Sequence, residues 1–393
     1  MIHEAIKKLG ELDVIEPATA DNAQIASPVV IVIQKGKPRF CVDFREINSK
    51  TKPDRYALPR QDSIFRTLAG AIYFTLLDAN KGYHQFGLTK RAKVLTAFIT
   101  EDGIWVYKRL PFGLKNAPAH FQRTIDTILR QYRWDFAMAY IDDIIIFSKT
   151  FAEHLLHVEL VLDALQQAGL TLEETKCHFC YESLELLGHH VSRLGLATME
   201  EKVRAITELP FPKTIKKAME VLGMFNYYRS FIKWFAWIAA PLYDGLKKPS
   251  NIADESKFDL KSRARMHGRR TFPDTPETRK AFELLKRALA SAPVLIHPDF
   301  EREFTLYIDA CKLGVAGTLA QVSAEDDKEH PILYISRRLN QYEAKYTSTE
   351  LECLGLVWNL NKLAHYIDGA KLKLFTDHSA LKWIWGIKSD LNA

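Results

Sequence analysis

Cysteines and long apolar runs are scarce in this chain. It contains five cysteines in 393 residues, and this small odd number fits a reducing compartment better than a disulfide-stapled secreted fold. No stretch of about 18 apolar residues occurs, so the sequence predicts no transmembrane helix. The opening residues, Met1 to Glu4, lack the apolar core of a signal peptide. We therefore expect an intracellular protein of the cytoplasm or the nucleus, neither secreted nor bound to a membrane.

The composition marks no unusual class of protein. Hydrophobic residues make up 47% and charged residues 26% of the chain, as in ordinary globular proteins, and the length allows two or three domains. The formal net charge is +6. A mild basic excess suits a partner that carries phosphates, but many metabolic enzymes share it, so the charge alone assigns no function.

One cysteine pair has the spacing of half a zinc site. Cys177 and Cys180 are separated by two residues, and His189 and His190 follow closely enough to complete four ligands. Short motifs of this kind often match by chance. We therefore favour two buried thiols over a zinc site.

Two adjacent acids lie in the middle of an apolar stretch. Asp142 and Asp143 are flanked by the apolar residues 136–139 and 144–147, which predicts a hairpin with the acids at its turn. Neighbouring carboxylates in such surroundings are costly unless a cation balances them, and Mg²⁺ prefers oxygen ligands. Asp78 ends another apolar run, so three acids would meet if the two strands are neighbours. The alternative is that Asp78 caps a helix and the other two only form a turn.

The pattern of apolar residues predicts further elements. A helix is expected over 152–169 with Gly169 at its C-terminus, and its apolar face comprises Leu155, Val158, Leu162 and Leu165. The segment 248–276 is polar and basic, which predicts a linker or mobile loop, with a solvated tether favoured over a nucleic-acid contact. An α/β pattern follows. Its predicted helices are 277–290 and 347–366, and its predicted strands are 303–310, 314–322, 331–336 and 371–376.

A series of motifs occurs in one recognisable order between residues 26 and 246. They are ASPVVIV (26–32), RFCVDFREIN (39–48), YALPR (56–60), YFTLLDANKGYHQ (73–85), LPFGLKNAPAHFQ (110–122), YIDDIIIFSK (140–149), KCHF (176–179), LLGHHVS (186–192) and LGMFNYYRSFI (222–232). By these motifs the chain resembles the reverse transcriptase of gypsy-type long-terminal-repeat retrotransposons, and more distantly that of retroviruses. The resemblance implies an α+β right-hand polymerase with fingers, palm and thumb.

The resemblance also implies roles for individual residues. Asp78, Asp142 and Asp143 match the metal-binding triad, which would hold Mg²⁺ or Mn²⁺. Tyr83 matches the aromatic gate that excludes a ribose 2′-hydroxyl, and Phe112 lies where the family contacts the incoming nucleotide. Arg39, and with weaker support Lys35, match the residues that grip the triphosphate of a dNTP. The expected partners are an RNA template, a DNA primer, their RNA–DNA hybrid and dNTPs. After Asp78 the chain has Ala79-Asn80-Lys81 instead of the usual Leu, basic residue and Ser, so its basic charge is shifted by one position.

Residues 300–393 resemble the ribonuclease H domain that follows the polymerase in the same elements. The motifs are LYIDACKLGVAGTLAQ (306–321), YISRRLN (334–340), YTSTELECLGLVWNL (346–360), HYIDG (365–369) and LFTDHSALKW (374–383). Asp309, Glu352 and Asp377 are the implied acids, which would bind two metal ions against an RNA phosphate. Glu350 is the rival of Glu352. Two residues along a helix correspond to a rotation of about 200°, so only one of the two glutamates would face the site.

The expected domains are fingers and palm (1–199), thumb (200–247), a tether with a linker helix (248–299) and an incomplete ribonuclease H-like α/β domain (300–393). The expected activity is RNA-directed DNA synthesis. The alternative is a retroelement remnant that folds and binds nucleic acid or protein without polymerising. The sequence says nothing about oligomeric state.

The first prediction concerns the ribonuclease H-like domain. The family's fourth acid and its last strand and helix would fall beyond Ala393, and a sheet without its final elements leaves apolar surface uncovered. We therefore expect weak or absent cleavage of RNA in an RNA–DNA hybrid by the purified chain. Robust cleavage in a gel assay, absent from a Glu352→Gln variant, would contradict this expectation.

Overall fold

The computed structural model describes residues 2–19, 25–34, 36–247 and 260–377, in two compact units, Met1–Leu184 and Glu185–Ala393. Lys35, expected at the triphosphate, lies outside the described residues, as does part of the predicted C-terminal domain. Among the described residues, no helix has the length and apolar character needed to cross a bilayer. The four-domain division expected from the sequence stays a prediction.

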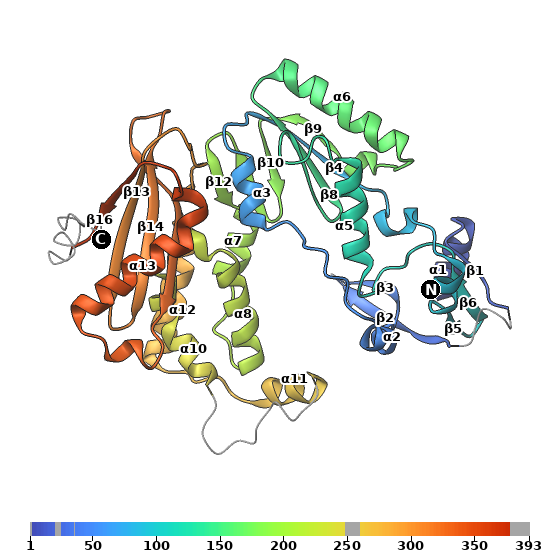
Figure 1. Cartoon of the computed structure of the whole chain (residues 1–393). Coiled ribbons are helices and arrows are strands. Elements are labelled where there is room, and N and C mark those ends of the chain that lie inside the picture. The colour runs from blue at the N-terminus through green and yellow to red at the C-terminus, as the bar shows by residue number, and fades with distance from the viewer. Residues whose placement is uncertain (1, 20–24, 35, 248–259, 378–393) are drawn as a thin grey trace, which may run out of the picture. The chain divides into compact units, whose positions relative to one another are not determined.

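The first unit contains two sheets (Figure 1). One has the strand order β1-β6-β5-β2-β3 and the other β7-β8-β4-β9. The strands are β1 Ile15–Pro17, β2 Ser27–Gln34, β3 Lys37–Val42, β4 Tyr73–Asp78, β5 Phe98–Thr100, β6 Gly103–Tyr107, β7 Ala137–Tyr140, β8 Asp143–Ser148 and β9 His178–Tyr181. The helices are α1 Ile2–Glu11, α2 Arg45–Lys50, α3 Gln61–Thr67, α4 Lys90–Val94, α5 Ala117–Ile128 and α6 Phe151–Gln167, with 3₁₀ turns η1 Gly82–Gln85 and η2 Glu174–Lys176.

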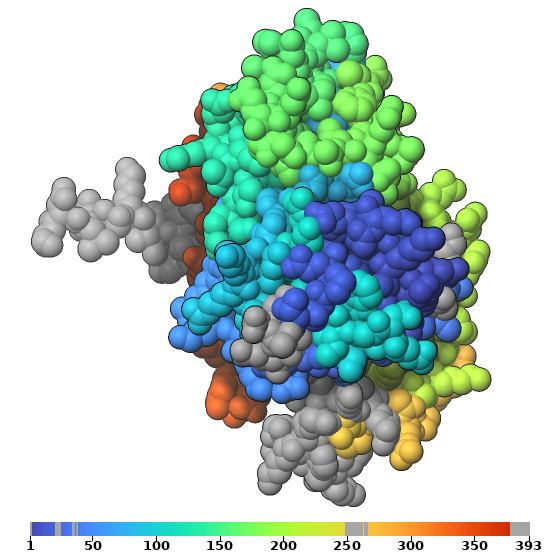
Figure 2. All heavy atoms as spheres, turned by 90° about the vertical axis from the view of Figure 1, so that its right-hand side faces the viewer, coloured from blue at the N-terminus to red at the C-terminus, as the bar shows by residue number. Residues whose placement is uncertain are grey.

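Each sheet of this unit has its own core. In the space-filling view the dark-blue residues of α1 and β1 lie directly beside the cyan residues of β5 and β6 (Figure 2), and Ile6, Phe44 and Phe98 are buried there. In the other sheet, Leu77 and Ile144 pack with residues of α5 and α6. The near-continuous apolar runs of β4 and β8 fit strands that are buried at both faces.

Helix α6 follows β8 and begins with a capping box. The Thr150 side chain accepts a hydrogen bond from the Glu153 backbone, and the Glu153 side chain accepts one from the Thr150 backbone. The apolar face predicted for this helix is partly wrong. Leu155 is 51% exposed, whereas His154 is buried. A polar side chain occupies the core position because the strands beneath it offer hydrogen-bonding hydroxyl groups.

The second unit begins with the sheet β10-β11-β12, continues with helices and ends in the sheet β15-β14-β13-β16. The strands are β10 Ser183–Leu186, β11 His189–Ser192, β12 Gly195–Thr198, β13 Phe304–Cys311, β14 Gly314–Val322, β15 Glu329–Arg338 and β16 Leu372–Phe375. The helices are α7 Glu200–Thr207, α8 Ile215–Tyr227, α9 Phe235–Ile238, α10 Ala240–Leu246, α11 Leu260–Arg269, α12 Pro276–Ala290 and α13 Ser348–Ile367, with 3₁₀ turns η3 Arg229–Phe231 and η5 Glu343–Lys345. Because α11 occupies 260–269, the segment predicted as a linker or loop is partly helical.

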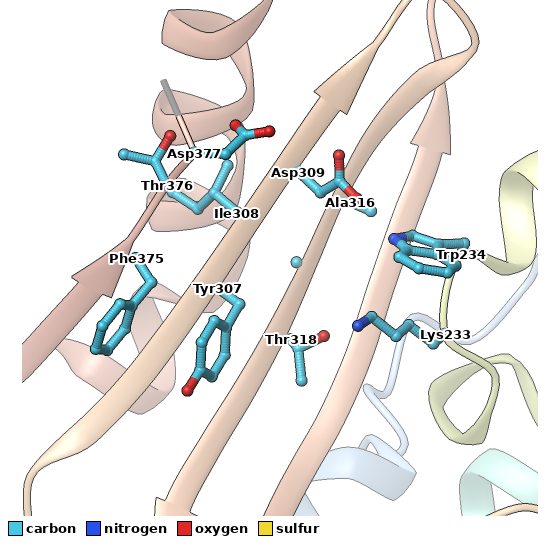
Figure 3. Close-up of a pocket in the computed structure, with 11 residues that line it drawn as sticks. Lys233, Trp234, Tyr307, Ile308, Asp309, Ala316, Thr318, Phe375, Thr376 and Asp377 are labelled. Atoms are coloured by element: carbon cyan, nitrogen blue, oxygen red, sulfur yellow. The ribbon is translucent and has the colours of Figure 1, made fainter. Parts of the chain in front are cut away.

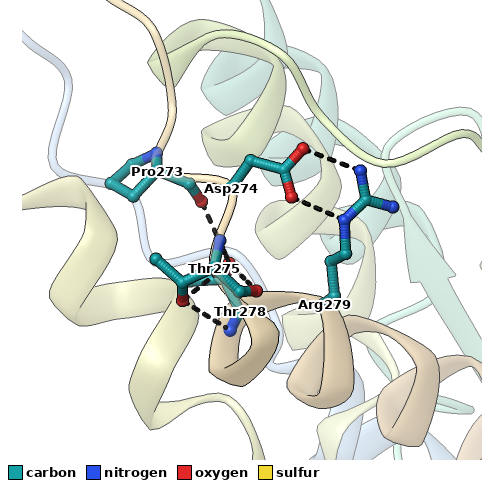
Figure 4. A network of polar contacts seen from close by, with 5 residues as sticks. All are labelled: Pro273, Asp274, Thr275, Thr278 and Arg279. Carbon is teal, nitrogen blue, oxygen red and sulfur yellow. Dashed lines mark hydrogen bonds and ion pairs between the residues drawn. The ribbon is translucent and has the colours of Figure 1, made fainter.

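Helix α12 has a well-defined start (Figure 4). The Thr275 hydroxyl accepts from the Thr278 backbone, and the Thr278 hydroxyl donates to the Pro273 carbonyl at 3.0 Å. Asp274 pairs with Arg279 through two contacts, at 2.5 and 2.7 Å. These contacts satisfy backbone groups of the first turn, which lets the apolar side of α12 pack into a core of aromatic side chains. That core contains Phe225, Phe231, Phe272 and Phe282.

The burial of His154 generates a prediction about pH. Its ring nitrogens contact the Thr75 hydroxyl at 2.8 Å and the Ser148 hydroxyl at 2.9 Å. Burial, with a smaller effect of His157, lowers the pKa of His154 from 6.5 to about 4. The unfolded chain therefore binds more protons than the folded chain between these pH values, and stability falls as the pH drops from 6.5 to 4.

Between pH 7 and pH 5, we expect the protonation of His154 to lower the unfolding free energy by roughly 2 kcal/mol. Urea unfolding of the full chain at pH 7 and pH 5 measures it, with His154→Asn compared with the wild type. The variant should be less stable at pH 7 but less sensitive to pH. If the unfolding free energy of His154→Asn falls between pH 7 and pH 5 by as much as that of the wild type, the assignment to His154 is wrong.

Candidate functional site

Three acids lie together at one end of the β7-β8-β4-β9 sheet. Asp78 is the last residue of β4 and Asp143 the first of β8, and the two are direct partners in the antiparallel register. Asp142 precedes Asp143 in the turn of the β7-β8 hairpin, where Tyr140 pairs with Asp143. Directly opposed residues of antiparallel strands have Cβ atoms about 5 Å apart. The strands thus gather the three acids that the sequence predicted.

The hairpin turn is held by a residue that the sequence analysis missed. Ile141 has a φ of +52°, a left-handed conformation that is costly for a β-branched residue. The buried Gln122 amide stabilises it, because its oxygen accepts from the Ile141 backbone at 2.7 Å and its nitrogen donates to the Ala139 carbonyl at 2.9 Å. The same nitrogen donates to Asp126 at 3.0 Å, and the Tyr56 hydroxyl donates to Asp126 at 2.5 Å. Gln122 ends the motif at 110–122, and a polar residue on a buried helix face was the available signal.

Burial and the charges of the neighbouring acids raise the pKa values of two of the three carboxyl groups. Burial first, and then the charges of Asp78 and Asp142, raise the pKa of Asp143 to about 6. Burial and Asp78 also raise the pKa of Asp142. Lys176 opposes both effects, and its ammonium group lies 3.1 Å from an oxygen of Asp78. Lys176 begins the KCHF motif, but its sequence position alone predicted no role for it.

The donor groups suit a divalent cation. One oxygen of Asp142 is buried and accepts no hydrogen bond within the described residues, and three carboxylates supply the hard oxygen ligands that Mg²⁺ and Mn²⁺ take. In the described ranges, no three His, Cys, Asp or Glu side chains already converge on a point where a metal ion would sit. Asp78 is paired with Lys176 instead. The three carboxylates are therefore ligands of the kind that a divalent cation takes, and they would bind it together.

An aromatic pair stands beside these acids. Tyr83 lies in η1 and is buried, and its ring packs edge-on against Phe112 at 4.9 Å and Phe121 at 5.5 Å between centroids. Phe112 is 50% exposed. The structure thus brings together Tyr83 and Phe112 as expected. Arg39 is exposed on β3, and within the described residues no hydrogen bond, ion pair or ring contact joins it to the acids.

A second group of acids lies in the C-terminal sheet. Asp309 is on β13 and Asp377 follows β16, which pairs with β13 in parallel. Both line a cavity of about 390 Å³ (Figure 3). Glu352 on α13 is 5% exposed, and burial together with the charges of Asp377 and Asp309 raises its pKa to about 7. One oxygen of Glu352 has no hydrogen-bond partner among the described residues, so this set also has an open ligand position.

Glu350, the alternative to Glu352 in the sequence, caps the start of helix α13. Glu350 forms a capping box with Thr347, whose backbone donates to the Glu350 carboxylate at 2.7 Å. Glu350 is exposed at the start of α13, whereas Glu352 is buried one half-turn further along the helix. The geometry places Glu352, and not Glu350, near Asp309 and Asp377.

The residues weighed for zinc have other surroundings. Cys177 and Cys180 are half-buried free thiols. A ring N–H of His189 donates to the Leu187 carbonyl at 3.0 Å, and the ring stacks with that of Phe231 at 5.6 Å between centroids. No zinc-type cluster occurs in the part of the chain that the structure describes.

Comparisons with known proteins match both halves of the chain. Residues 27–191 match the reverse transcriptase (RNA-dependent DNA polymerase) family model, and residues 275–374 match an RNase H-like domain found in reverse transcriptase. The retrovirus-related Pol polyproteins from transposons 297 and gypsy of Drosophila melanogaster are each 37% identical, over 93% and 97% of this chain. The Tf2-3 polyprotein of Schizosaccharomyces pombe is 32% identical over 91%. The chain spans 33%, 36% and 25% of these three relatives.

Solved structures show the same fold. A foamy viral protease–reverse transcriptase (dRH) in complex with double-stranded DNA matches 98% of this chain and 64% of its own, with a TM-score of 0.82 and 23% identity. A second such structure with double-stranded DNA has a TM-score of 0.80 and covers 98% of this chain and 76% of its own. The predicted fold class, a polymerase followed by a ribonuclease H-like domain, is confirmed.

The first acid group generates a stability prediction through Gly82. A Cβ at this position would lie 2.7 Å from a ring carbon of Phe121 and 2.9 Å from an oxygen of Asp142. We expect Gly82→Ala to lower the unfolding free energy by about 1–3 kcal/mol, because overpacking displaces neighbours. Gly87→Ala is the matched control, since nothing lies within 4 Å of its Cβ position. Equal urea midpoints for the two variants would count against this close approach.

Proposed function

Because the chain belongs to the retrovirus-related Pol polyproteins of gypsy-type retrotransposons, and carries their reverse transcriptase domain, we propose that it catalyses RNA-directed DNA synthesis. The observation that carries this proposal is the cross-strand pairing of Asp78 with Asp143, with Asp142 in the adjoining turn. Three carboxylates at the end of two paired strands, one with a buried unpartnered oxygen, suit catalysis with divalent cations.

In this proposal the three acids hold Mg²⁺ or Mn²⁺. Bound there, a pair of such ions would stabilise the attacking and leaving oxygens of an in-line displacement at phosphorus. The protein's own contribution is to fix the acids before the substrate arrives. Gln122 does so for the hairpin, because its amide holds the backbone on both sides of Ile141. Lys176 balances Asp78 while the site lacks other cations.

The nucleotide would lie against the aromatic pair. Tyr83 is held by Phe112 and Phe121, so its ring offers a fixed wall that would exclude a 2′-hydroxyl by size. Phe112 remains half exposed and would contact the incoming dNTP. Arg39, and Lys35 beyond the described residues, would grip the triphosphate, for which fixed cations are suited.

The RNA template, the DNA primer and their hybrid would bind chiefly through phosphates. In the second unit, Asp309, Glu352 and Asp377 would hold divalent ions for hydrolysis of the RNA strand. Support comes from the buried, unpartnered oxygen of Glu352 and its raised pKa near the other two acids. The weak hydrolysis expected from the sequence stays a prediction.

Primer extension tests the polymerase. On poly-rA/oligo-dT with Mg²⁺ and dTTP, we expect Asp142→Asn to lose at least about 100-fold of the wild-type rate, because asparagine keeps the shape but removes the charge that a metal ion requires. Asp163→Asn is the matched control, since Asp163 is exposed on α6. Circular dichroism should show that both variants fold.

The same assay separates the two candidate functions. Equal incorporation by the wild type and Asp142→Asn, or none by either, would favour a remnant that folds and binds without polymerising. A large loss confined to Asp142→Asn would favour the enzyme.

A further inference from the structure

Part of the cavity beside Asp309 is lined by side chains from a segment that neither family model covers. Lys233 and Trp234 come from the turn between η3 and α9, and the matched segments end at 191 and resume at 275. Figure 3 shows both side chains on the opposite side of the cavity from Phe375. The cavity therefore joins the acids of the C-terminal sheet to a basic and aromatic turn from outside that sheet.

On the cavity side of the sheet, side chains from neighbouring strands form two rows, one with Tyr307 and one with Asp309. Tyr307 is paired with Thr318 on β14 and with Phe375 on β16, so these three side chains lie across adjacent strands. Asp309 lies two residues further along β13, about 6.6 Å away by the rise of a strand. Because Leu306 and Ile308 point into the core beneath α13, Tyr307 and Asp309 occupy the other face of the sheet.

The aromatic side chains are exposed but held rigidly. The rings of Tyr307 and Phe375 stack at 5.1 Å with an angle of 18°, and the Tyr307 hydroxyl donates to Glu329 at 2.7 Å. Trp234 stacks on Trp237 at 5.8 Å with an angle of 6°. Tyr307, Phe375 and Trp234 remain 38%, 49% and 38% exposed. Large exposed rings that are fixed in place lose little entropy when a ligand packs on them.

Lys233 supplies an available positive charge. It is exposed, its ammonium group lies 4.5 Å from the centre of the Trp234 ring, and it forms no ion pair within the described part of the chain. Trp234 itself has a φ of +56°, a strained conformation that presents its side chain and that of Lys233 toward the cavity (Figure 3). A lysine, exposed rings, a threonine hydroxyl and metal-binding acids form a groove suited to a polynucleotide strand.

We propose that the turn formed by Lys233 and Trp234 is a positioning element, which holds the RNA strand of an RNA–DNA hybrid in this groove next to Asp309 and Asp377. Lys233 contacts a backbone phosphate, and Trp234 and Tyr307 pack against ribose faces within a few nucleotides of the acids. This assignment rests on the proposed function, and it adds a substrate-positioning contact from a segment that lies outside both matched domains.

Photo-crosslinking tests the position of the strand. The full chain is irradiated with a hybrid that carries 5-iodouridine in its RNA strand, with Ca²⁺ in place of Mg²⁺ to prevent cleavage. Mass spectrometry should find crosslinks on Trp234, Tyr307 or Phe375. Crosslinks to these residues only from a label in the DNA strand, or none at them from either strand, would overturn the proposal.

Binding measurements test the energetic contribution. We expect Lys233→Ala to weaken hybrid binding about fivefold at moderate salt and to reduce the slope of log K against log salt by about one. Lys233→Arg should retain most of the affinity. Trp234→Gly, which keeps the left-handed backbone without strain, should also weaken binding. Lys362→Ala is the matched control, because Lys362 is exposed on α13, at the opposite face of the sheet.

The outcomes separate this inference from the proposed function. If the wild type extends primers and binds hybrid, but Lys233→Ala binds as the wild type does, only the groove assignment fails. If the wild type neither extends primers nor binds hybrid, the proposed function fails with it. Equal competition by a free nucleoside monophosphate and by hybrid would also overturn the assignment to a strand.

Discussion

Repulsion among carboxylates is the constraint on which the candidate site of the first unit depends. Asp78 and Asp143 face each other across two strands, and Asp142 adds a third charge at the turn. Such a group costs folding free energy while no cation balances it. The chain tolerates it because Lys176 balances Asp78 and because the apolar strands beneath are buried at both faces. The stability of the sheet thus supports an arrangement that is unfavourable by itself.

In both groups of acids, backbone geometry brings carboxylates together, but the secondary-structure elements that do so differ. In the first unit, two antiparallel strands and a turn supply the acids. In the second, a strand, a helix and the end of a parallel strand supply them. In each case one carboxylate oxygen is buried without a partner among the described residues, on Asp142 and on Glu352. Chemistry that requires hard oxygen ligands is compatible with either sheet type, because it needs only that backbone geometry brings charges to one place.

The sequence predicted best where local pattern and burial agree. The hairpin around Asp142 was predicted because apolar strands flank a short turn, and β14 was predicted with the bounds Gly314–Val322 that the structure has. The buried face of α6 was partly mispredicted, because hydrophobic periodicity does not foresee that His154 finds hydroxyl partners on two strands. Helix α11 was missed because its polar composition carries no apolar face.

Residues that act through hydrogen bonds across long sequence separations were the hardest to find. Gln122 contacts a turn 19 residues away, and Lys176 pairs with an acid 98 residues away. Nothing in a local window of sequence identifies such partners. Arg39 illustrates the reverse case, since its predicted role comes from a motif, and among the described residues no contact favours that role over an ordinary surface position.

The contacts of Tyr56 connect the irregular segment 52–60, which precedes α3, to helix α5. This segment has no ladder of backbone hydrogen bonds. It is attached to α5 by side chains, because Arg123 pairs with Asp54 at 2.6 Å and lies over the Tyr56 ring. Through Asp126 and Gln122, the same helix supports the turn that carries Asp142. A displacement of this loop would therefore be transmitted through one buried carboxylate, Asp126, to the turn that carries Asp142, which makes the irregular segment a structural brace for that turn.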